Sequence, residues 1–148
     1  MPGLAMVYLP ATVLSRNGGP RDPGVLGLVG VVPIVVGLTV LFWCFAGFVV
    51  EGEGTPAPYD PPRRLVSGRL YRWTRNPMYV AVTTVVLGEA LLFGSPALLA
   101  YAAGLWVVFH LFVTLYEEPG LRARFGPSYE AYLRTVPRWI PRRLVPPY

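Results

Sequence analysis

The sequence predicts an all-α fold, a polytopic membrane helical bundle with about four transmembrane or partial segments and a cytoplasmic amphipathic C-terminal helix. Three observations support this prediction. Hydrophobic residues make up 53% of the 148-residue chain, and its mean hydropathy is positive. The apolar residues gather in long stretches, and short segments rich in Gly, Pro and Arg separate these stretches. A chain of this length forms a single domain, residues 1–148.

Charge and cysteine content exclude several function classes. All thirteen basic residues are arginines, which cluster in loops beside apolar stretches. The positive-inside rule explains this distribution better than nucleic-acid binding, so we expect no nucleic-acid partner. Cys44 is the single cysteine, and it supports neither a disulfide nor a Cys-His zinc site, so no metal is expected. The exclusive use of Arg is typical of a GC-rich bacterial source.

The first apolar stretch, residues 1–14, is too short to cross a bilayer straight, because about 20 residues are needed. It lacks the basic start of a signal peptide and contains Pro10. We therefore expect a tilted or partial helix, and whether it spans the membrane stays open. Residues 16–24 are rich in turn-forming residues and predict a loop.

The second apolar stretch, residues 25–50, is long enough to span the membrane with some tilt. Gly27, Gly30 and Gly37 would let a neighbouring helix approach closely. Pro33 predicts a kink. A polar, proline-rich loop follows over residues 51–64.

Two further apolar segments, residues 78–93 and 97–116, flank a Gly-Ser-Pro turn and predict a helical hairpin. Five arginines lie between residues 63 and 75 and six between residues 122 and 143, whereas the turn carries no charge. Both arginine-rich segments should therefore be cytoplasmic. Residues 121–133 alternate apolar and polar positions at helical spacing, which predicts a single amphipathic surface helix, and Trp139 and Tyr148 suit the membrane interface.

Two motifs lie where apolar segments meet polar ones on this cytoplasmic side. Arg75-Asn76-Pro77-Met78-Tyr79 precedes one apolar segment, and Glu117-Glu118-Pro119 follows the next. Phe125-Gly126-Pro127-Ser128-Tyr129 and Val136-Pro137-Arg138 come after them. This order resembles the cofactor-binding half of the integral-membrane methyltransferases, the family that contains isoprenylcysteine carboxyl methyltransferases and phospholipid methyltransferases. The resemblance covers roughly residues 55–141.

The resemblance implies S-adenosyl-L-methionine as the cofactor. Its ribose diol, ammonium, carboxylate and sulfonium need carboxylate acceptors, a guanidinium or amide donor and an apolar or aromatic wall. The expected cofactor-binding residues are Leu65, Val66, Tyr71, Arg75, Asn76, Pro77, Met78, Tyr79, Glu117 and Glu118. Arg75 would hold the methionyl carboxylate and Glu118 the ribose hydroxyls, with Glu117 as the adjacent alternative. In the competing interpretation, the glutamates only end a helix in water and Arg75 snorkels.

Two departures from the family pattern leave the methyl acceptor open. The prenylcysteine enzymes carry His where this chain has Asn76, and an amide does not titrate, so no proton transfer is assigned there. They also carry an Arg about one turn before the glutamates, where this chain has Val113 and Thr114. A prenylcysteine substrate is therefore not implied.

His110 is the candidate catalytic residue. At helical spacing His110, Thr114 and one of the two glutamates share a stripe, and an ionisable residue inside a membrane segment is a functional candidate. A structural interhelical hydrogen bond is an equal alternative. Glu89 lies near the far end of its helix, too remote for methyl transfer, and we expect a structural hydrogen bond or a protonated state there.

The sequence thus predicts S-adenosyl-L-methionine-dependent methyl transfer to a small apolar or amphiphilic, lipid-like acceptor. The expected location is the cytoplasmic face of a bacterial inner membrane, with that acceptor and the lipid bilayer as partners and the oligomeric state open. Two alternatives remain. In the first, the protein is a small proton-coupled multidrug-type exporter that uses Glu89. In the second, it is a noncatalytic membrane adaptor that binds no cofactor.

Overall fold

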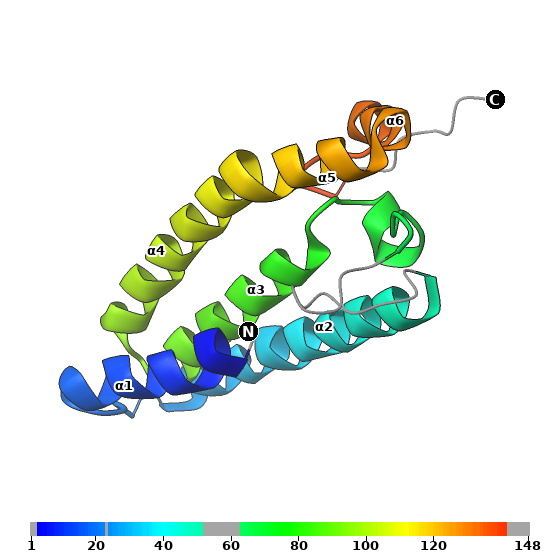
Figure 1. The fold of residues 1–148 in the computed structure, drawn as a ribbon. Helices are drawn as coiled ribbons and strands as arrows, with labels where there is room; N and C mark the ends of the chain where they lie inside the picture. The colour runs from blue at the N-terminus through cyan, green and yellow to red at the C-terminus, as the bar shows by residue number, and fades with distance from the viewer. Residues whose placement is uncertain (1–2, 23, 52–62, 142–148) are drawn as a thin grey trace. The chain divides into compact units, whose positions relative to one another are not determined.

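A computed structural model describes residues 3–22, 24–51 and 63–141, and each regular element in these ranges is a helix (Figure 1). The all-α prediction is confirmed. The α-helices are α1 (Leu9–Arg16), α2 (Val31–Glu51), α3 (Pro77–Leu92), α4 (Pro96–Phe112), α5 (Glu118–Phe125) and α6 (Pro127–Thr135). Short π-helical turns, η1 (Leu4–Tyr8) and η4 (Val113–Glu117), and 3₁₀ helices, η2 (Gly24–Gly30) and η3 (Arg69–Arg72), adjoin them.

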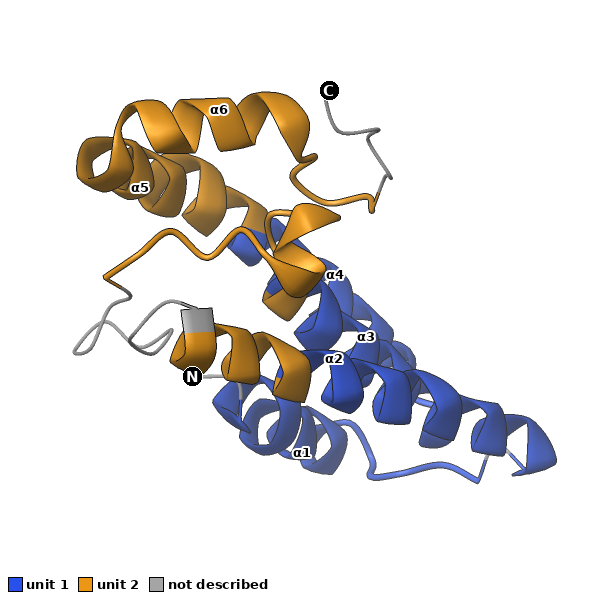
Figure 2. Cartoon of the chain, turned by 90° about the vertical axis from the view of Figure 1, so that its right-hand side faces the viewer, with its two compact units in different colours: residues 1–41, 79–109 blue, residues 42–78, 110–148 orange. Residues whose placement is uncertain are grey.

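The chain forms two compact units, shown in blue and orange in Figure 2. Unit 1 comprises Met1–Leu41 and Tyr79–Phe109, and unit 2 comprises Phe42–Met78 and His110–Tyr148. Each unit therefore combines segments that are distant in the sequence.

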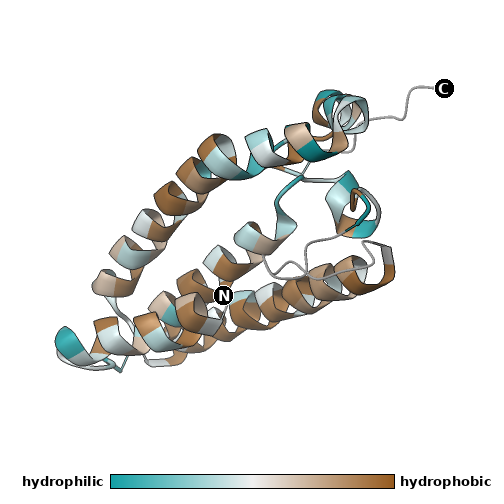
Figure 3. Cartoon of the chain, in the orientation of Figure 1, coloured by the Kyte–Doolittle hydropathy of each residue, from teal (hydrophilic) through white to brown (hydrophobic). Residues whose placement is uncertain are grey.

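Two continuous helical stretches, Gly24–Val50 and Pro96–Phe125, are long and apolar enough to cross a membrane. Figure 3 shows hydrophobic residues along α2 and α4 and more hydrophilic ones on α5 and α6. Leu4–Arg16 and Pro77–Leu92 are shorter apolar helices. Four membrane segments therefore remain a prediction, whereas the apolar helical character of the expected segments is confirmed.

Glycines bring the helices of unit 1 into backbone contact. A Cβ atom added at Gly30 would lie 2.4 Å from the carbonyl oxygen of Gly88, and one at Gly88 would lie 2.6 Å from that of Gly30. A Cβ atom at Gly37 would lie 2.8 Å from the Ala81 oxygen. The predicted close approach at Gly30 and Gly37 is confirmed, and its partner helix is α3.

The hairpin of α3 and α4 forms as predicted. Gly94, with φ +55°, makes the turn between them, a backbone conformation that favours glycine. Pro33 falls in the first turn of α2, directly after the 3₁₀ helix η2, and its kink stays a prediction. The change of helix type comes before Pro33, at the junction of η2 and α2.

The prediction of one helix over residues 121–133 is wrong, because two helices meet at Gly126. Gly126 has φ +51° and ψ −125°, a conformation that residues with side chains avoid, and Pro127 begins α6. The amphipathic character is confirmed for α6, which buries Tyr129 and Tyr132, three positions apart. The loop of residues 52–62 and the terminal Tyr148, to which predictions were attached, lie outside the described residues.

Candidate functional site

Within unit 2, a buried glutamate joins two arginines that come from different motifs. Nη1 of Arg75 lies 3.0 Å from Oε1 of Glu118. Arg138 donates to the same carboxylate twice, from Nε to Oε1 at 2.8 Å and from Nη2 to Oε2 at 3.1 Å. We call these three residues the Glu118 cluster. Such forked, charge-assisted pairs are among the stronger polar contacts in proteins.

Backbone and side-chain hydrogen bonds hold the two arginine-bearing segments together. The backbone N–H of Arg75 donates to the Pro137 carbonyl at 2.9 Å. The Thr74 hydroxyl and the Asn76 amide donate to the carbonyl of Arg138 at 3.0 and 3.1 Å. Three contacts thus fix the segment at residues 137–138 against the start of α3, which sets where the Arg138 guanidinium can reach.

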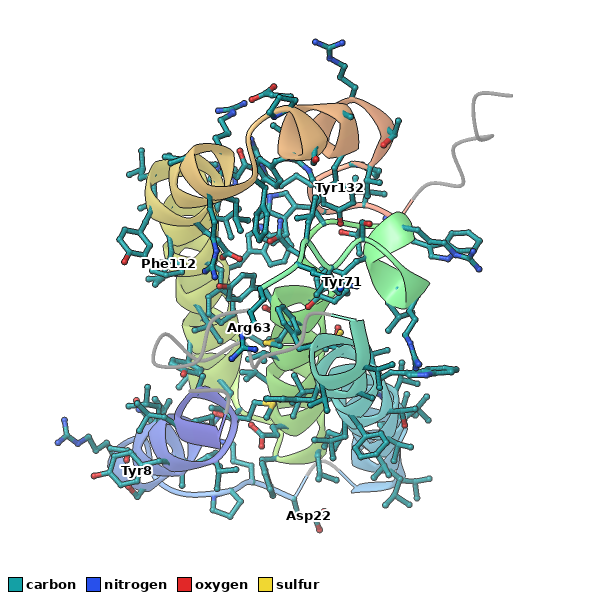
Figure 4. All side chains as sticks on the ribbon, turned by 45° about the vertical axis from the view of Figure 1, so that its right-hand side comes forward. Tyr8, Asp22, Arg63, Tyr71, Phe112 and Tyr132 are labelled. Carbon is teal, nitrogen blue, oxygen red and sulfur yellow. The ribbon has the colours of Figure 1, made fainter. Side chains whose placement is uncertain are left out.

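An aromatic layer supports this arrangement. The Tyr132 hydroxyl donates to the Tyr71 carbonyl at 2.5 Å, and both tyrosines are labelled in Figure 4. Tyr129 and Tyr132 form a buried core with Val136. Partly buried Leu65, Leu121, Phe125 and Leu133 pack on this core. Burial raises the pKa of Tyr71 and that of Tyr132 above the usual tyrosine range, so both hydroxyls stay protonated at neutral pH.

A π-helical turn decides which glutamate is buried. In an α-helix Glu117, four residues after Val113, would share the face of Val113. In η4 the N–H of Glu118 donates instead to the Val113 carbonyl, which adds one residue to the turn. Val113 and Glu118 are accordingly 1% and 5% exposed, whereas Glu117 is only partly buried. The turn ends two residues before Pro119, whose missing N–H disturbs the regular helical ladder.

The charge of the cluster favours an anion. Two guanidinium groups face one carboxylate, and the hydrogen bond from Arg138 to Glu118 raises the pKa of Arg138 and keeps it charged. Burial raises the pKa of Tyr129; the negative charge of Glu118 adds to this shift and the positive charge of Arg75 opposes it. Tyr129 is therefore a neutral hydroxyl beside a cluster that carries one net positive charge.

The donor set fits part of S-adenosyl-L-methionine. Nε of Arg75 is buried with no hydrogen-bond partner among the described residues, and the side chain of Arg138 remains 34% exposed. These guanidinium groups suit a carboxylate. Glu118 has about four lone-pair positions, and the arginines occupy three of them. The remaining position cannot accept both hydroxyls of a ribose diol.

The structure brings many of the predicted site residues into unit 2. Arg75 and Glu118 are paired, Asn76 holds the Arg138 carbonyl, and Tyr71 accepts from Tyr132. Val66 and Pro77 are buried, and Leu65, Met78 and Glu117 are partly buried. Tyr79 begins the α3 portion of unit 1, where its ring lies 4.7 Å from that of Phe109.

Sequence reasoning assigned no role to Arg138, which belongs to the Glu118 cluster, or to Thr74 and Tyr129, which interact with its arginines. Arg138 belongs to the motif Val136-Pro137-Arg138. The available signal was its position, since it is a cation directly after a proline that ends an amphipathic segment. Within the described residues, no group of three His, Cys, Asp or Glu side chains gathers that could hold a metal ion. Glu89 lies in α3 of unit 1, with a buried Oε2 that lacks a partner among the described residues.

Comparison with known proteins points in one direction. The family model for phospholipid methyltransferase matches residues 25–128. The protein-S-isoprenylcysteine O-methyltransferase of Schizosaccharomyces pombe is 37% identical to this chain over 78 residues. That match covers 52% of this chain but 33% of the yeast protein, so the chain spans about a third of the length of that relative. No solved structure matches the chain significantly.

Proposed function

The chain belongs to the phospholipid methyltransferase family, and from this premise we propose that it transfers a methyl group from S-adenosyl-L-methionine to a lipid-like acceptor. The observation that carries the proposal is the Glu118 cluster. Arg75 lies 43 residues before Glu118 in the chain and Arg138 lies 20 residues after it, and both bind this one buried carboxylate. An ion pair that serves only the protein surface would not need a carboxylate that is 5% exposed. The proposed location is the cytoplasmic face of a bacterial inner membrane, as the arginine distribution predicts.

Each residue of the cluster has a distinct proposed role. Arg75 and Arg138 bind the methionyl carboxylate through guanidinium N–H groups that Glu118 leaves unused. Glu118 positions both arginines and does not itself hold the ribose. Glu117, next to it and partly exposed, accepts hydrogen bonds from the ammonium group or the ribose hydroxyls. The bound cofactor supplies an electrophilic methyl group on its sulfonium.

The apolar helices supply the acceptor side. Methyl transfer from a sulfonium needs a positioned nucleophile and exclusion of water more than it needs acid-base groups. Many large apolar side chains of α2 and α4 are exposed, including Phe42, Trp43, Val107 and Val108, as expected for helices that contact lipid. We propose that an amphiphilic acceptor reaches the site laterally from the bilayer, whereas the soluble cofactor enters from the cytoplasm.

Calorimetry with the full-length protein in nanodiscs tests the cofactor assignment. Wild type should bind S-adenosyl-L-methionine or its demethylated product. Arg75→Lys and Arg138→Lys should each weaken binding about tenfold or more, because a point charge does not replace a fork. Arg122→Lys is the matched control, since Arg122 pairs with Glu130 at the surface, where both side chains are about half exposed. Equal affinity in all four proteins would refute the assignment.

A second measurement identifies the acceptor. Lipid extracts are incubated with protein and cofactor that carries an isotopically labelled methyl group, and mass spectrometry then locates the label. Labelling of an amphiphile by wild type that is reduced in Arg75→Lys and Arg138→Lys would support the proposal. Tight cofactor binding with no labelled product in any extract would refute a lipid-like acceptor, whereas the absence of cofactor binding would favour the noncatalytic adaptor.

A further inference from the structure

A directional hydrogen bond joins the single histidine of the chain to a tryptophan. The indole Nε1–H of Trp139 donates to Nδ1 of His110 at 3.2 Å. The two ring centroids lie 6.0 Å apart, with an angle of 36° between the ring planes. His110 is exposed and Trp139 is partly buried, both in unit 2. Core packing alone does not explain this contact, because neither ring is fully enclosed.

The chemistry of the two rings decides where the histidine proton lies. An indole N–H only donates, so the Nδ1 atom that accepts from it carries a lone pair. A neutral imidazole has one N–H proton, which must then be on Nε2. We infer that Trp139 is a positioning residue that fixes His110 in its Nε2–H tautomer. His110 thus presents a hydrogen-bond donor at Nε2, not a base that abstracts a proton.

Neighbouring contacts hold this pair in place. Trp139 directly follows Arg138, whose carbonyl accepts from Thr74 and Asn76 and whose guanidinium grips Glu118. The Thr114 hydroxyl donates to the backbone carbonyl of His110 at 2.7 Å, so its proton does not compete for Nδ1. Two adjacent residues therefore serve two purposes, since Arg138 organises the Glu118 cluster and Trp139 orients His110.

The tautomer narrows the class of methyl acceptor, and this step rests on the proposed function. A donor at Nε2 binds a head group through an oxygen of a carboxylate, phosphate or carbonyl group. It cannot remove the proton of a hydroxyl group. The nucleophile must therefore react without first losing a proton to His110, as an ionised carboxylate or a neutral amine does.

Nitrogen NMR of the intact protein tests the tautomer without any methyl transfer. Protein labelled with ¹⁵N-histidine contributes two ring signals, because His110 is the single histidine. At a pH where the ring is neutral, Nδ1 should resonate as an unprotonated nitrogen and Nε2 as a protonated one. In Trp139→Phe the two signals should move toward each other as the tautomers mix. Trp43→Phe, at an exposed tryptophan of α2, is the matched control and should leave both signals unchanged. A proton on Nδ1 in wild type would overturn the inference.

Turnover separates a donor from a base. His110→Ala should lower the methylation rate about 100-fold, whereas His110→Gln, which keeps an N–H donor, should stay within about tenfold of wild type. Trp139→Phe should lower the rate about three- to tenfold at unchanged cofactor affinity. A glutamine variant as inactive as the alanine variant would refute the donor role. If no methylation is found at all, the proposed function fails while the NMR result still decides the tautomer.

Discussion

Unit 1 and unit 2 are stabilised by different kinds of contact. In unit 1, glycines such as Gly30 and Gly88 let helix backbones touch. Two longer connections also end on backbone oxygens, from Tyr101 to Ala5 and from Arg21 to Phe93. In unit 2, charged and polar side chains join the segments, with Glu118 at the centre. The packing of unit 1 depends on glycines, which have no side chain to keep the helices apart. The packing of unit 2 depends on hydrogen bonds and ion pairs between side chains.

The largest effect should come from removing the central carboxylate of unit 2. In Glu118→Ala, two guanidinium groups remain without their counter-charge, and breaking a buried pair in this way costs about 3–5 kcal/mol. The free energy of unfolding of the purified protein should fall by that amount, and cofactor binding should disappear in calorimetry. Glu130→Ala is the control, because its pair with Arg122 is exposed and should cost about 1 kcal/mol or less. Equal losses in the two variants would show that the cluster is no more important than a surface pair.

An intermediate effect should come from filling the backbone contact of unit 1. In Gly88→Ala the new Cβ atom would lie 2.6 Å from the Gly30 oxygen and 2.9 Å from the Ile34 nitrogen, so α3 must shift. Overpacking of this kind costs about 1–3 kcal/mol. Gly104→Ala is the control. It should not lower the unfolding free energy, because nothing lies within 4 Å of its added Cβ atom and alanine favours a helix by up to about 1 kcal/mol over glycine.

The comparison is sharpened by measuring two quantities on the same variants. Thermal unfolding should respond to both Glu118→Ala and Gly88→Ala, whereas cofactor affinity of the folded protein should respond only to the first. A loss of affinity in Gly88→Ala as large as that in Glu118→Ala would mean that the contacts of unit 1 also set the geometry of the site.

The sequence predicted unit 1 better than unit 2 for a physical reason. Apolar stretches and small residues are local signals, so residues 25–50 and 78–93 were placed within about one residue, and the close approach at Gly30 was anticipated. Arg138 lies 20 residues from the Glu118 that it binds. No periodicity of a helix indicates which residue of a distant loop will reach a carboxylate.

The glutamate pair illustrates a second limit. Regular helical spacing from His110 allowed either Glu117 or Glu118 on the same stripe, and only the additional residue of η4 distinguishes them. Pro119 was a visible hint of irregularity. A π-helical turn, however, follows from how its surroundings accommodate the proline, which the sequence alone does not specify.

The smallest effect concerns the hydroxyl of Tyr132, a polar contact of unit 2 that carries no charge. Burial raises the pKa of Tyr132 above its ordinary value of 10.0. The folded state therefore keeps the phenol proton at a pH where the unfolded chain has lost it. The resulting stabilisation is complete below pH 10 and decreases as pH rises from 10 toward the folded-state pKa, by at most about 1.4 kcal/mol per pH unit.

Tyr132→Phe should therefore have two separable consequences. At pH 8 it should cost about 1 kcal/mol, because the hydrogen bond to the Tyr71 carbonyl is lost. Between pH 10 and pH 11 the unfolding free energy of the variant should decrease less steeply than that of wild type, since one of the buried tyrosines no longer titrates. Tyr116→Phe, at a 71% exposed tyrosine of η4, provides the control and should leave the unfolding free energy at pH 8 unchanged. Parallel slopes for wild type and Tyr132→Phe would mean that the hydroxyl ionises equally well in the folded and unfolded chain, and that burial does not raise its pKa.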